Sequence, residues 1–298
     1  MFLTIDTTSV AKAWAIALQR VFFEGDVIKS EYDTGNDFPT RDSTSAIHVS
    51  APFSDPFSIR GKIVKVASET IYCHPGDVYC LEAIKGGYLA EVMAGDRDKE
   101  IWASDTSYPY TYHDRLFNYK ALNTEDEPYL KNVSAAMLKS LAEMQGIDQI
   151  ALAARKLKTA PHSRRAQAIT WRPLSDPERD DPPCLQRIWF RVHDGKLRMN
   201  THWRSRDLFG AWEANINGML LIAKRVADEL EVEVGDYTDF CDSLHVYGRR
   251  KLVFKEVLPL LVLGQLFFGT ETTFQWLMQL FICILIPRII TWSYAWIK

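Results

Sequence analysis

The sequence contains few cysteines and no excess of basic residues, and both shortages narrow the functions it can serve. The five cysteines are an odd number in 298 residues, and they lack the Cys-x-x-Cys spacing of metal sites: Cys73, Cys80, Cys184, Cys241 and Cys283. A disulfide framework and a metal site are therefore not expected, and the predicted compartment is the reducing cytoplasm. The net charge of −3 provides no basic field for nucleic acid, although a local group of arginines could still bind one phosphate.

The beginning of the chain also lacks the features of a targeting segment. The first twelve residues contain no basic stretch followed by an apolar run, so we expect no secretory signal. Hydrophobic residues make up 47% of the sequence, which is enough for a large core. We expect residues 1–250 to form one folded domain and residues 251–298 to form a hydrophobic tail of different composition.

Hydrophobic periodicity predicts helices mixed with strands, which is typical of an α/β fold. Thr8 or Ser9 is expected to begin a helix that ends near Phe23, and a loop is expected over residues 38–45. Further helices are predicted over 133–156, with an interruption near Gly146, and over 214–230. The predicted strands cover 46–49, 168–171, 187–193, 197–203 and a short final segment that carries His245; an Asp-Gly turn at 194–195 joins two of them as a hairpin.

The stretch from Asp181 to Tyr247 carries chemically reactive and polar residues in a distinctive order. A lone cysteine, Cys184, follows two prolines, and an Arg-Ser pair comes directly after the second strand of the hairpin. An amide, Asn215, lies near the start of the last predicted helix, and a His-x-Tyr motif closes the stretch. Because side chains alternate along a strand, the histidine and the tyrosine of that motif are expected on one face.

This order resembles the thymidylate synthase family, and the absence of a histidine after the cysteine is similar to the archaeal-type branch. The resemblance is specific over about residues 163–247. It implies a mixed sheet with flanking helices (α/β, or α+β) and a homodimer packed sheet to sheet. It also implies reductive methylation of dUMP to dTMP, with 5,10-methylenetetrahydrofolate as the co-substrate.

The resemblance assigns roles to matching positions of this sequence. Cys184 is the implied nucleophile, and Arg204 is implied to contact both its sulfur and the substrate phosphate. A segment similar to Tyr-x-Tyr-Gly-x-Arg-Leu implies that Tyr112 lies beside the pyrimidine, with His113 in place of the glycine. The other implied substrate-binding residues are Arg41 in a loop over the phosphate, Arg164 and Arg165 for the partner's phosphate, Ser205 for phosphate, Asp207 and Asn215 for the pyrimidine, and His245 and Tyr247 for the deoxyribose hydroxyl.

The implied nucleophile fits the chemistry of the pyrimidine. Carbon 6 of uracil is a weak electrophile, and addition of a thiolate there makes carbon 5 an enolate-like nucleophile. A free thiol has a pKa of about 8.5, and neighbouring arginines lower it. Cys184 lies in sequence between the Arg164-Arg165 pair and Arg204, so we expect an electropositive setting for its sulfur.

The amide at position 215 indicates which base is bound. Uracil presents an acceptor at O4 and a donor at N3, and one carboxamide answers both, whereas cytosine reverses the pattern. A mismatch costs about 1–3 kcal/mol for each buried polar group left unsatisfied. Asn215 therefore favours dUMP; the alternative within the enzyme class is a dCMP hydroxymethylase, in which the family has an aspartate at this position.

Some positions depart from the family pattern. Trp203 stands where many relatives have glutamine before Arg-Ser, and Glu91 is the nearest candidate for the general acid-base glutamate. Residues 252–268 and 276–297 are two apolar runs where the family is more polar, with Pro287 and Arg288 in the middle of the second.

Three interpretations of the tail remain open. It is a membrane-associating hairpin, a buried tail in an oligomer, or the product of a reading-frame change. An arginine in the middle of a membrane-spanning helix costs about 2.5–3.5 kcal/mol on insertion scales. A second alternative is therefore an inactive nucleotide-binding or membrane-associated homologue, with membrane contact expected only through residues 252–297.

Overall fold

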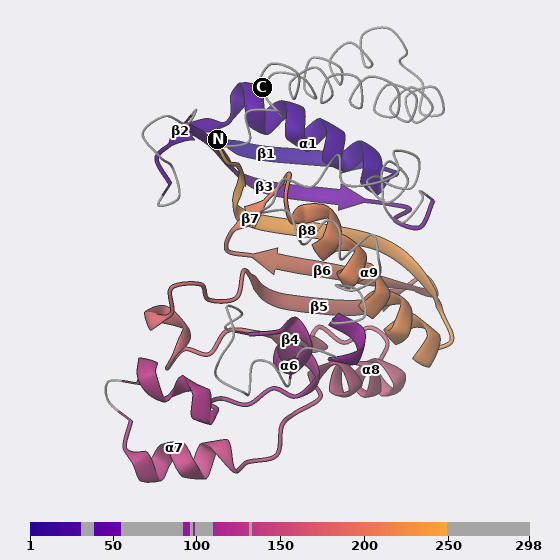
Figure 1. Cartoon of the computed structure of the whole chain (residues 1–298). Coiled ribbons are helices and arrows are strands. Elements are labelled where there is room, and N and C mark those ends of the chain that lie inside the picture. The colour runs from indigo at the N-terminus through magenta and orange to yellow at the C-terminus, as the bar shows by residue number, and fades with distance from the viewer. Residues whose placement is uncertain (31–38, 55–91, 96–97, 99–109, 131–132, 249–298) are drawn as a thin grey trace, which may run out of the picture.

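A computed structural model describes residues 1–30, 39–54, 92–95, 98, 110–130 and 133–248, which build one mixed sheet with helices packed against it (Figure 1). Glu91 and the tail over residues 251–298 lie outside the described residues, so the expectations for them stay predictions. Within the described part, the architecture confirms the expected mixed α/β class.

The sheet is the frame of the described structure. Its six-strand path has the order β1-β3-β8-β6-β5-β4, while β2 pairs with β3 and β7 pairs with β8. The pairs β1–β3 and β6–β8 are parallel, and β3–β8, β5–β6 and β4–β5 are antiparallel, so the sheet is mixed. The strands are β1 (Phe2–Thr7), β2 (Asp26–Ile28), β3 (Thr40–Val49), β4 (Gln167–Ile169), β5 (Leu185–His193), β6 (Lys196–Trp203), β7 (Arg206–Asp207) and β8 (Glu233–Val246).

The longer helices cover one face of this sheet. Helix α1 contacts β1 and β3, α9 contacts β6 and β8, and α8 contacts β4 and β5 (Figure 1). Ser9 caps α1 as expected, because its side chain accepts the backbone N–H of Lys12 at 3.1 Å. The described helices are α1 (Val10–Glu24), α6 (Tyr112–Phe117), α7 (Ala135–Ala142), α8 (Gln149–Thr159) and α9 (Trp212–Glu229), with 3-10 turns η1 (Thr124–Tyr129) and η2 (Asp176–Glu178).

Strand alternation separates a buried face from an open face. On the helix side, the core includes Ile47, Met199 and Phe190, all fully buried. On the other side, the register aligns one row of residues across six strands: Thr4, Ala46, Phe240, His202, Arg187 and Ile169. Phe240 in this row is 42% exposed, so the open face carries a large apolar side chain at its centre.

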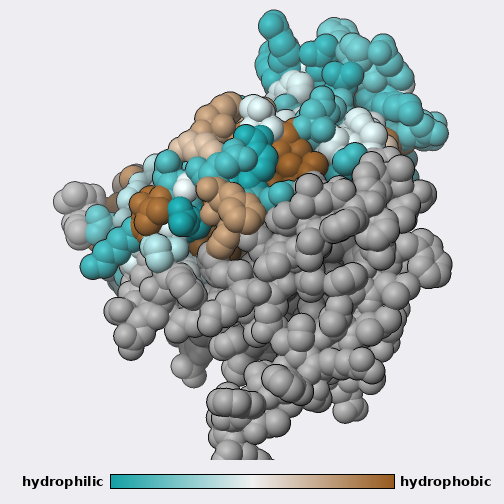
Figure 2. All heavy atoms as spheres, turned by 90° about the horizontal axis from the view of Figure 1, so that it is seen from above, coloured by the Kyte–Doolittle hydropathy of each residue, from teal (hydrophilic) through white to brown (hydrophobic). Residues whose placement is uncertain are grey.

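The described surface seen from above carries several separate apolar areas (Figure 2), whereas the open face of the sheet has one large apolar side chain at its centre. Small brown apolar areas lie among teal hydrophilic ones on the described part of this view (Figure 2). Scattered exposed apolar residues of this kind are ordinary on protein surfaces.

The structure corrects two of the predicted elements and confirms the interruption in a third. The segment expected as a loop over residues 38–45 belongs largely to β3, because Thr40 to Ser43 pair with β2 or β8 and Thr44 pairs with Phe2 of β1. The helical pattern over 133–156 is two helices, α7 and α8, separated around Gly146 as expected. The final strand is 14 residues long rather than short, since Gly235 and Asp236 lie within β8.

Candidate active site

The candidate residues gather where β5 begins and where β6 and β8 end. Leu185 at the start of β5 pairs with Trp203 at the end of β6, and Trp203 pairs in turn with Cys241 of β8. The backbone N–H of Arg204 donates to the carbonyl of Cys184 at 2.9 Å. This pairing places the sulfur-bearing residue beside the Arg-Ser segment, as the sequence predicted.

The Cys184 thiol lies in a setting that differs from the one expected. Burial raises the pKa of Cys184, while Arg204 and Arg206 lower it and Asp181 raises it, so the net direction is upward. The expectation of a lowered pKa was wrong because burial outweighs the arginines. Arg204 contributes as predicted, and the second arginine at the sulfur is Arg206.

Arg204 braces the loop that carries the nucleophile. Its guanidinium Nε donates to the carbonyl of Pro183 at 3.1 Å, and Nη2 donates to the carbonyl of Pro182 at 2.5 Å. Its side chain remains 34% exposed. A charged group held in this way stays open on one side to an anionic ligand while it fixes the Pro-Pro-Cys turn.

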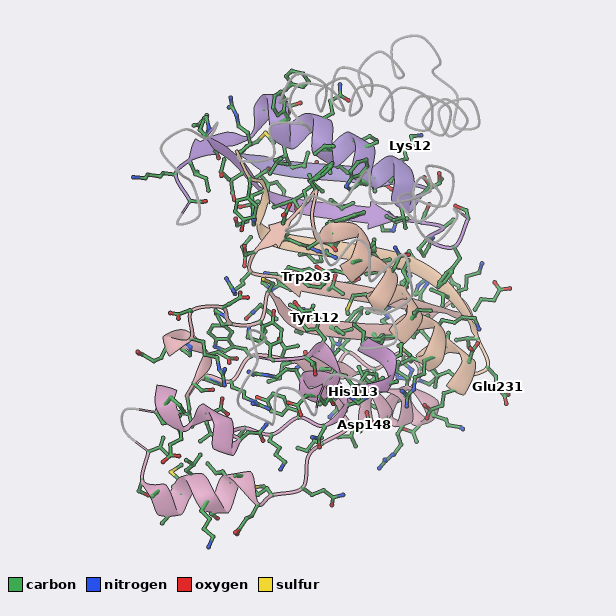
Figure 3. The ribbon with its side chains drawn as sticks, in the orientation of Figure 1. Lys12, Tyr112, His113, Asp148, Trp203 and Glu231 are labelled. Carbon is green, nitrogen blue, oxygen red and sulfur yellow. The ribbon has the colours of Figure 1, made fainter. Side chains whose placement is uncertain are left out.

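Two tyrosines approach the nucleophile from the start of α6. The hydroxyl of Tyr112 accepts the backbone N–H of Leu185 at 3.3 Å, and its ring packs edge-on against Trp203 with centroids 5.9 Å apart (Figure 3). Burial, Tyr112 and Cys184 together raise the pKa of Tyr110 well above its usual value. Tyr112 thus lies beside the start of the nucleophile's strand, and Tyr110 is a neighbour that was not predicted from the sequence.

His113, which replaces the family's glycine, is accommodated by its surroundings. Its Nδ1 lies 2.7 Å from a carboxylate oxygen of Asp98, and its ring stacks on Phe117. Gly95 makes room for it, because a Cβ at that position would come within 2.3 Å of the His113 ring. α6 forms with this histidine in place, and Thr111 caps the helix by accepting the N–H of Asp114.

His245, implied for the sugar, lies near the end of β8, and Asp207, implied for the pyrimidine, lies in β7 beside it. Asp207 pairs with His245, and the N–H of Leu208 donates to the carbonyl of His245 at 2.8 Å. The ring of His245 contacts that of Tyr247 with centroids 4.5 Å apart. His245 is buried, and its Nε2 has no hydrogen-bond partner among the described residues.

Asn215 lies in the first turn of α9, where the preceding loop fixes its position. The side chain of Asp207 accepts the N–H groups of Phe209 and Gly210 at 3.0 and 2.8 Å, which shapes the turn before the helix. Asn215 is buried, and Ser205 is half-buried directly after Arg204. Ser205 and Asn215 therefore both lie within twelve residues of Trp203, the last residue of β6.

Arg41 lies beside the end of β8, whereas the Arg164-Arg165 pair lies beside the edge strand β4. Arg41 is in β3 rather than in a loop; it pairs with Val246 of β8, and its guanidinium donates to the carbonyl of Gly25 at 3.4 Å. Arg164 and Arg165 are exposed beside the edge strand β4.

The distance along the strands separates this pair from Cys184. The carbonyl of Arg164 accepts the indole N–H of Trp189 at 3.1 Å. Trp189 lies five residues beyond Cys184, which at about 3.3 Å per strand residue is about 16 Å. The structure therefore does not bring Arg164 and Arg165 to the nucleophile of their own chain.

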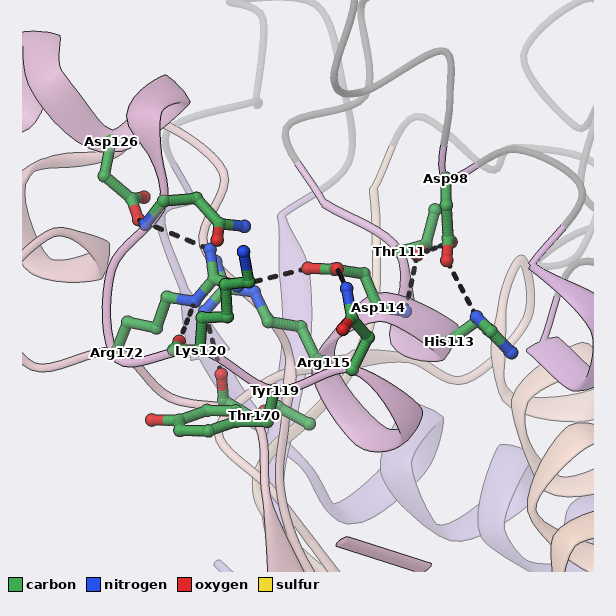
Figure 4. Close-up of polar contacts among 12 residues, drawn as sticks. Asp98, Thr111, His113, Asp114, Arg115, Tyr119, Lys120, Asp126, Thr170 and Arg172 are labelled. Carbon is green, nitrogen blue, oxygen red and sulfur yellow. Dashed lines mark hydrogen bonds and ion pairs between the residues drawn. The ribbon is translucent and has the colours of Figure 1, made fainter. Parts of the chain in front are cut away.

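Three arginines and three aspartates form a buried network, and Figure 4 shows four of them: Asp114, Arg115, Asp126 and Arg172. Arg115 of α6 binds Asp176 through two hydrogen bonds of 2.9 and 2.8 Å, and both side chains are almost fully buried. Arg172 joins Asp114 at 3.1 Å and Asp126 at 3.3 Å. Arg179 completes the set through Asp126 and Asp176, so three positive and three negative groups balance. This network ties α6 to the segment before Cys184.

The network was missed in the sequence because its members are far apart. Its residues run from Asp114 to Arg179 and meet only through the fold. Arg206 was missed for another reason, since it occupies the unassigned position between Ser205 and Asp207. The sequence of β8 did indicate that a buried cation was needed, because the charged residue Asp239 lies between Tyr237 and Cys241 on the same buried strand face.

The described residues contain neither a metal-binding cluster nor a membrane-spanning helix. No group of three or more His, Cys, Asp or Glu side chains there is arranged to hold a metal ion. No helix in the same part of the chain is both long and apolar enough to cross a membrane.

Comparison with known proteins agrees with this arrangement. A family model for thymidylate synthase matches residues 95–259. A protein of Methanothermobacter thermautotrophicus named "Putative thymidylate synthase" is 28% identical over 252 residues, which cover 83% of this chain and 94% of that protein. A protein of the same name from Methanothermobacter marburgensis is 41% identical over 113 residues, covering 38% of this chain and 51% of that protein. The thymidylate synthase of Listeria monocytogenes is 31% identical over 162 residues, 52% of either protein.

The family match covers more than half of the chain, and the chain therefore belongs to the thymidylate synthase family. The archaeal relatives confirm the resemblance to the archaeal-type branch. The chain spans about half the length of the Methanothermobacter marburgensis and Listeria proteins and most of the Methanothermobacter thermautotrophicus protein.

Proposed function

We propose that this chain catalyses the reductive methylation of dUMP to dTMP with 5,10-methylenetetrahydrofolate. The observation that carries the proposal is the meeting of Cys184, Arg204 and Tyr112 where β5 begins and β6 ends. Family membership supports the same reaction. Since a working thiol requires a reducing compartment, we propose the cytoplasm as its location.

The proposed reaction begins and ends at the sulfur of Cys184. The thiolate adds to carbon 6 of the uracil, and the electron pair of the ring double bond moves to carbon 5. Carbon 5 then bonds to the one-carbon unit and loses its proton, and the S–C6 bond breaks when the product forms. The reduced folate supplies the carbon and the hydride, while the chain holds the pyrimidine and stabilises the sulfur anion.

The charge of Arg204 suits the first step. Because burial raises the pKa of Cys184, the free thiol is mainly protonated at neutral pH, and the positive guanidinium favours the thiolate that must form. The Arg204 side chain is 34% exposed, with a distant ion-pair contact to Asp181 at 4.0 Å, and we propose that it also binds the substrate phosphate.

The chain's own polar groups fit the sugar and the base of dUMP. The buried Nε2 of His245 lacks a partner among the described residues, which suits a hydrogen bond to the deoxyribose hydroxyl. The amide of Asn215 offers the donor and acceptor that O4 and N3 of uracil require. Asp207 pairs with His245 and accepts the N–H of Gly210 in the turn before α9, which supports a shared site for these groups.

The open face of the sheet supports a homodimer packed sheet to sheet. It presents Phe240 and Ile169, which are 42% and 38% exposed, in a row with polar neighbours. The exposed Arg164 and Arg165 border the same sheet, where they would reach a partner's nucleotide rather than their own. Phe240→Asp is expected to convert the dimer to a monomer in light scattering, whereas the same change at exposed Phe23 on α1 leaves the dimer intact.

The test is release of tritium from carbon 5 of labelled dUMP in the presence of the folate. Wild-type protein is expected to release tritium and form dTMP, and Cys184→Ala to release none while melting at the same temperature. Hydroxymethyl-dCMP from dCMP as the sole product would replace the proposal with a hydroxymethylase. Nucleotide binding without any release would indicate an inactive homologue.

A further inference from the structure

Arg206 is a buried cation that the proposed mechanism leaves without a task. It lies between Ser205 and Asp207, and only 2% of it is exposed. Its guanidinium forms an ion pair with Asp239 of β8 and lies 3.8 Å from the ring centroid of Trp203. A buried charge is costly unless it is paired, so this position is expected to have a specific purpose.

The contacts of Arg206 form a closed ring of side chains. Asp239 accepts the hydroxyl of Tyr237 at 2.8 Å, and that hydroxyl lies 2.7 Å from the hydroxyl of Thr201. The indole N–H of Trp203 donates to the same Thr201 oxygen at 3.0 Å. Trp203 is therefore held at its edge by a hydrogen bond and at its face by a cation, which leaves the ring little freedom.

Trp203 transmits this constraint to the nucleophile. It pairs in the sheet with Leu185, the residue after Cys184. Its ring also meets the ring of Tyr112, whose hydroxyl accepts the N–H of Leu185 (Figure 3). The Trp203 ring is thus in contact with Arg206 on one face, and it contacts the Tyr112 ring, whose hydroxyl is hydrogen-bonded to the residue after Cys184.

We propose that Arg206 is a positioning residue for the nucleophile, which fixes Trp203 and the Tyr112–Leu185 contact and places a second positive charge on the buried side of the Cys184 sulfur. The proposal deepens the proposed function, on which it rests for the identity of the reaction. Arg204 acts from the solvent side, and Arg206 from the core.

The electrostatics of the sulfur agree with this geometry. Burial raises the pKa of Cys184, and both arginines oppose it. The titratable or charged groups that interact with the thiol are Asp181, Tyr110, Arg204, Arg206 and Cys241. The two arginines are the positive groups of this set, so loss of the buried one is expected to raise the pKa of the thiol further.

The test compares the pH dependence of Cys184 alkylation in matched variants of the full chain. Asp239→Asn keeps the cation, whereas Arg206→Met with Asp239→Asn removes it without leaving a buried carboxylate unpaired. Iodoacetamide labelling of the Cys184 peptide, followed by mass spectrometry, gives the midpoint. The double variant is expected to have a higher midpoint than Asp239→Asn and to react about 3–10-fold more slowly near neutral pH. Equal midpoints would overturn the electrostatic part of the proposal.

A second variant tests positioning and stays informative if the methionine variant does not fold. Arg206→Lys keeps the charge but loses the planar contact with Trp203. It is expected to keep the wild-type alkylation midpoint and melting temperature while tritium release falls about tenfold, which is a positioning loss of about 1.4 kcal/mol. Wild-type release rates in this variant would overturn the positioning part.

The alkylation assay separates this proposal from the proposed function. It needs neither dUMP nor folate, so the midpoints are measurable even in a protein that releases no tritium. Absence of release from the wild type would overturn the reaction, and equal midpoints would overturn the electrostatic role of Arg206.

Discussion

Asp176→Asn is expected to destabilise the fold strongly, because Asp176 is fully buried at the centre of the arginine–aspartate network. Its carboxylate accepts two hydrogen bonds from Arg115 and one from the backbone N–H of Arg172 at 2.7 Å. Burial and Arg172 lower the pKa of Arg115, and Asp176 opposes both effects. An asparagine keeps the shape but leaves a buried guanidinium without its counter-charge.

The expected magnitude follows from that burial. Breaking one partner of a buried, hydrogen-bonded ion pair costs about 3–5 kcal/mol. The matched control is Glu143→Gln, whose partner Lys139 lies at 4.0 Å with both side chains mostly exposed. An exposed pair of this kind contributes about 0–1 kcal/mol.

The assay is urea unfolding followed by tryptophan fluorescence, from which the free energy of unfolding is extrapolated. The double variant Arg115→Met with Asp176→Asn is expected to lose less than the sum of the single changes, because both remove the same interaction. If Asp176→Asn loses no more than Glu143→Gln, the network does not stabilise the packing of α6 as argued.

Three further predictions concern acid stability, base choice and the dimer. Burial alone would raise the pKa of Asp126, but Arg172 and hydrogen bonds hold it below its usual value, so the charged carboxylate stabilises the fold above about pH 4 and this stabilisation is lost as the pH falls through the folded-state pKa. Asp126→Asn is therefore expected to flatten the loss of unfolding free energy below about pH 4, and an unchanged slope would contradict this. Asn215→Asp is expected to lower kcat/KM for dUMP at least about tenfold and to improve the relative use of dCMP, because each mismatched buried polar group costs about 1–3 kcal/mol. Steady-state kinetics with both nucleotides measure this, and an unchanged ratio of kcat/KM for dUMP to that for dCMP would count against a base contact. Mixed Cys184→Ala and Arg165→Ala subunits are expected to regain up to about a quarter of wild-type tritium release, since half of the dimers contain one complete site; no recovery would place that arginine outside the partner's site.

Features set by neighbouring residues could be predicted from the sequence. The hairpin between β5 and β6 follows from the Asp-Gly turn, where Asp194 and Gly195 have φ values of 52° and 73° that suit those two residue types. The cap of Ser9 on α1 is local in the same way. The closeness of Cys184 to the Arg-Ser pair could also be predicted, because the two strands of a hairpin bring the start of the first and the end of the second together.

Features set by distant contacts could not be predicted. Arg206 and Asp239 meet across β7 and β8, and their pairing depends on burial that a single sequence does not display. The same holds for the pKa of Cys184, where the cost of burial exceeds the effect of charges that are visible in the sequence. The length of β8 was underestimated because Gly235 reads locally as a turn, whereas the ladder with β6 continues on both sides of it.

The central claim is a covalent bond between the Cys184 sulfur and carbon 6 of a pyrimidine. A dUMP analogue with fluorine at carbon 5 tests it most directly, because fluorine cannot leave as a proton does and the adduct cannot proceed to product. Incubation of the full chain with this analogue and the folate, followed by peptide mass spectrometry, is expected to show the added mass on the Cys184 peptide. An unmodified Cys184 peptide, in protein that binds the nucleotide, would contradict the account.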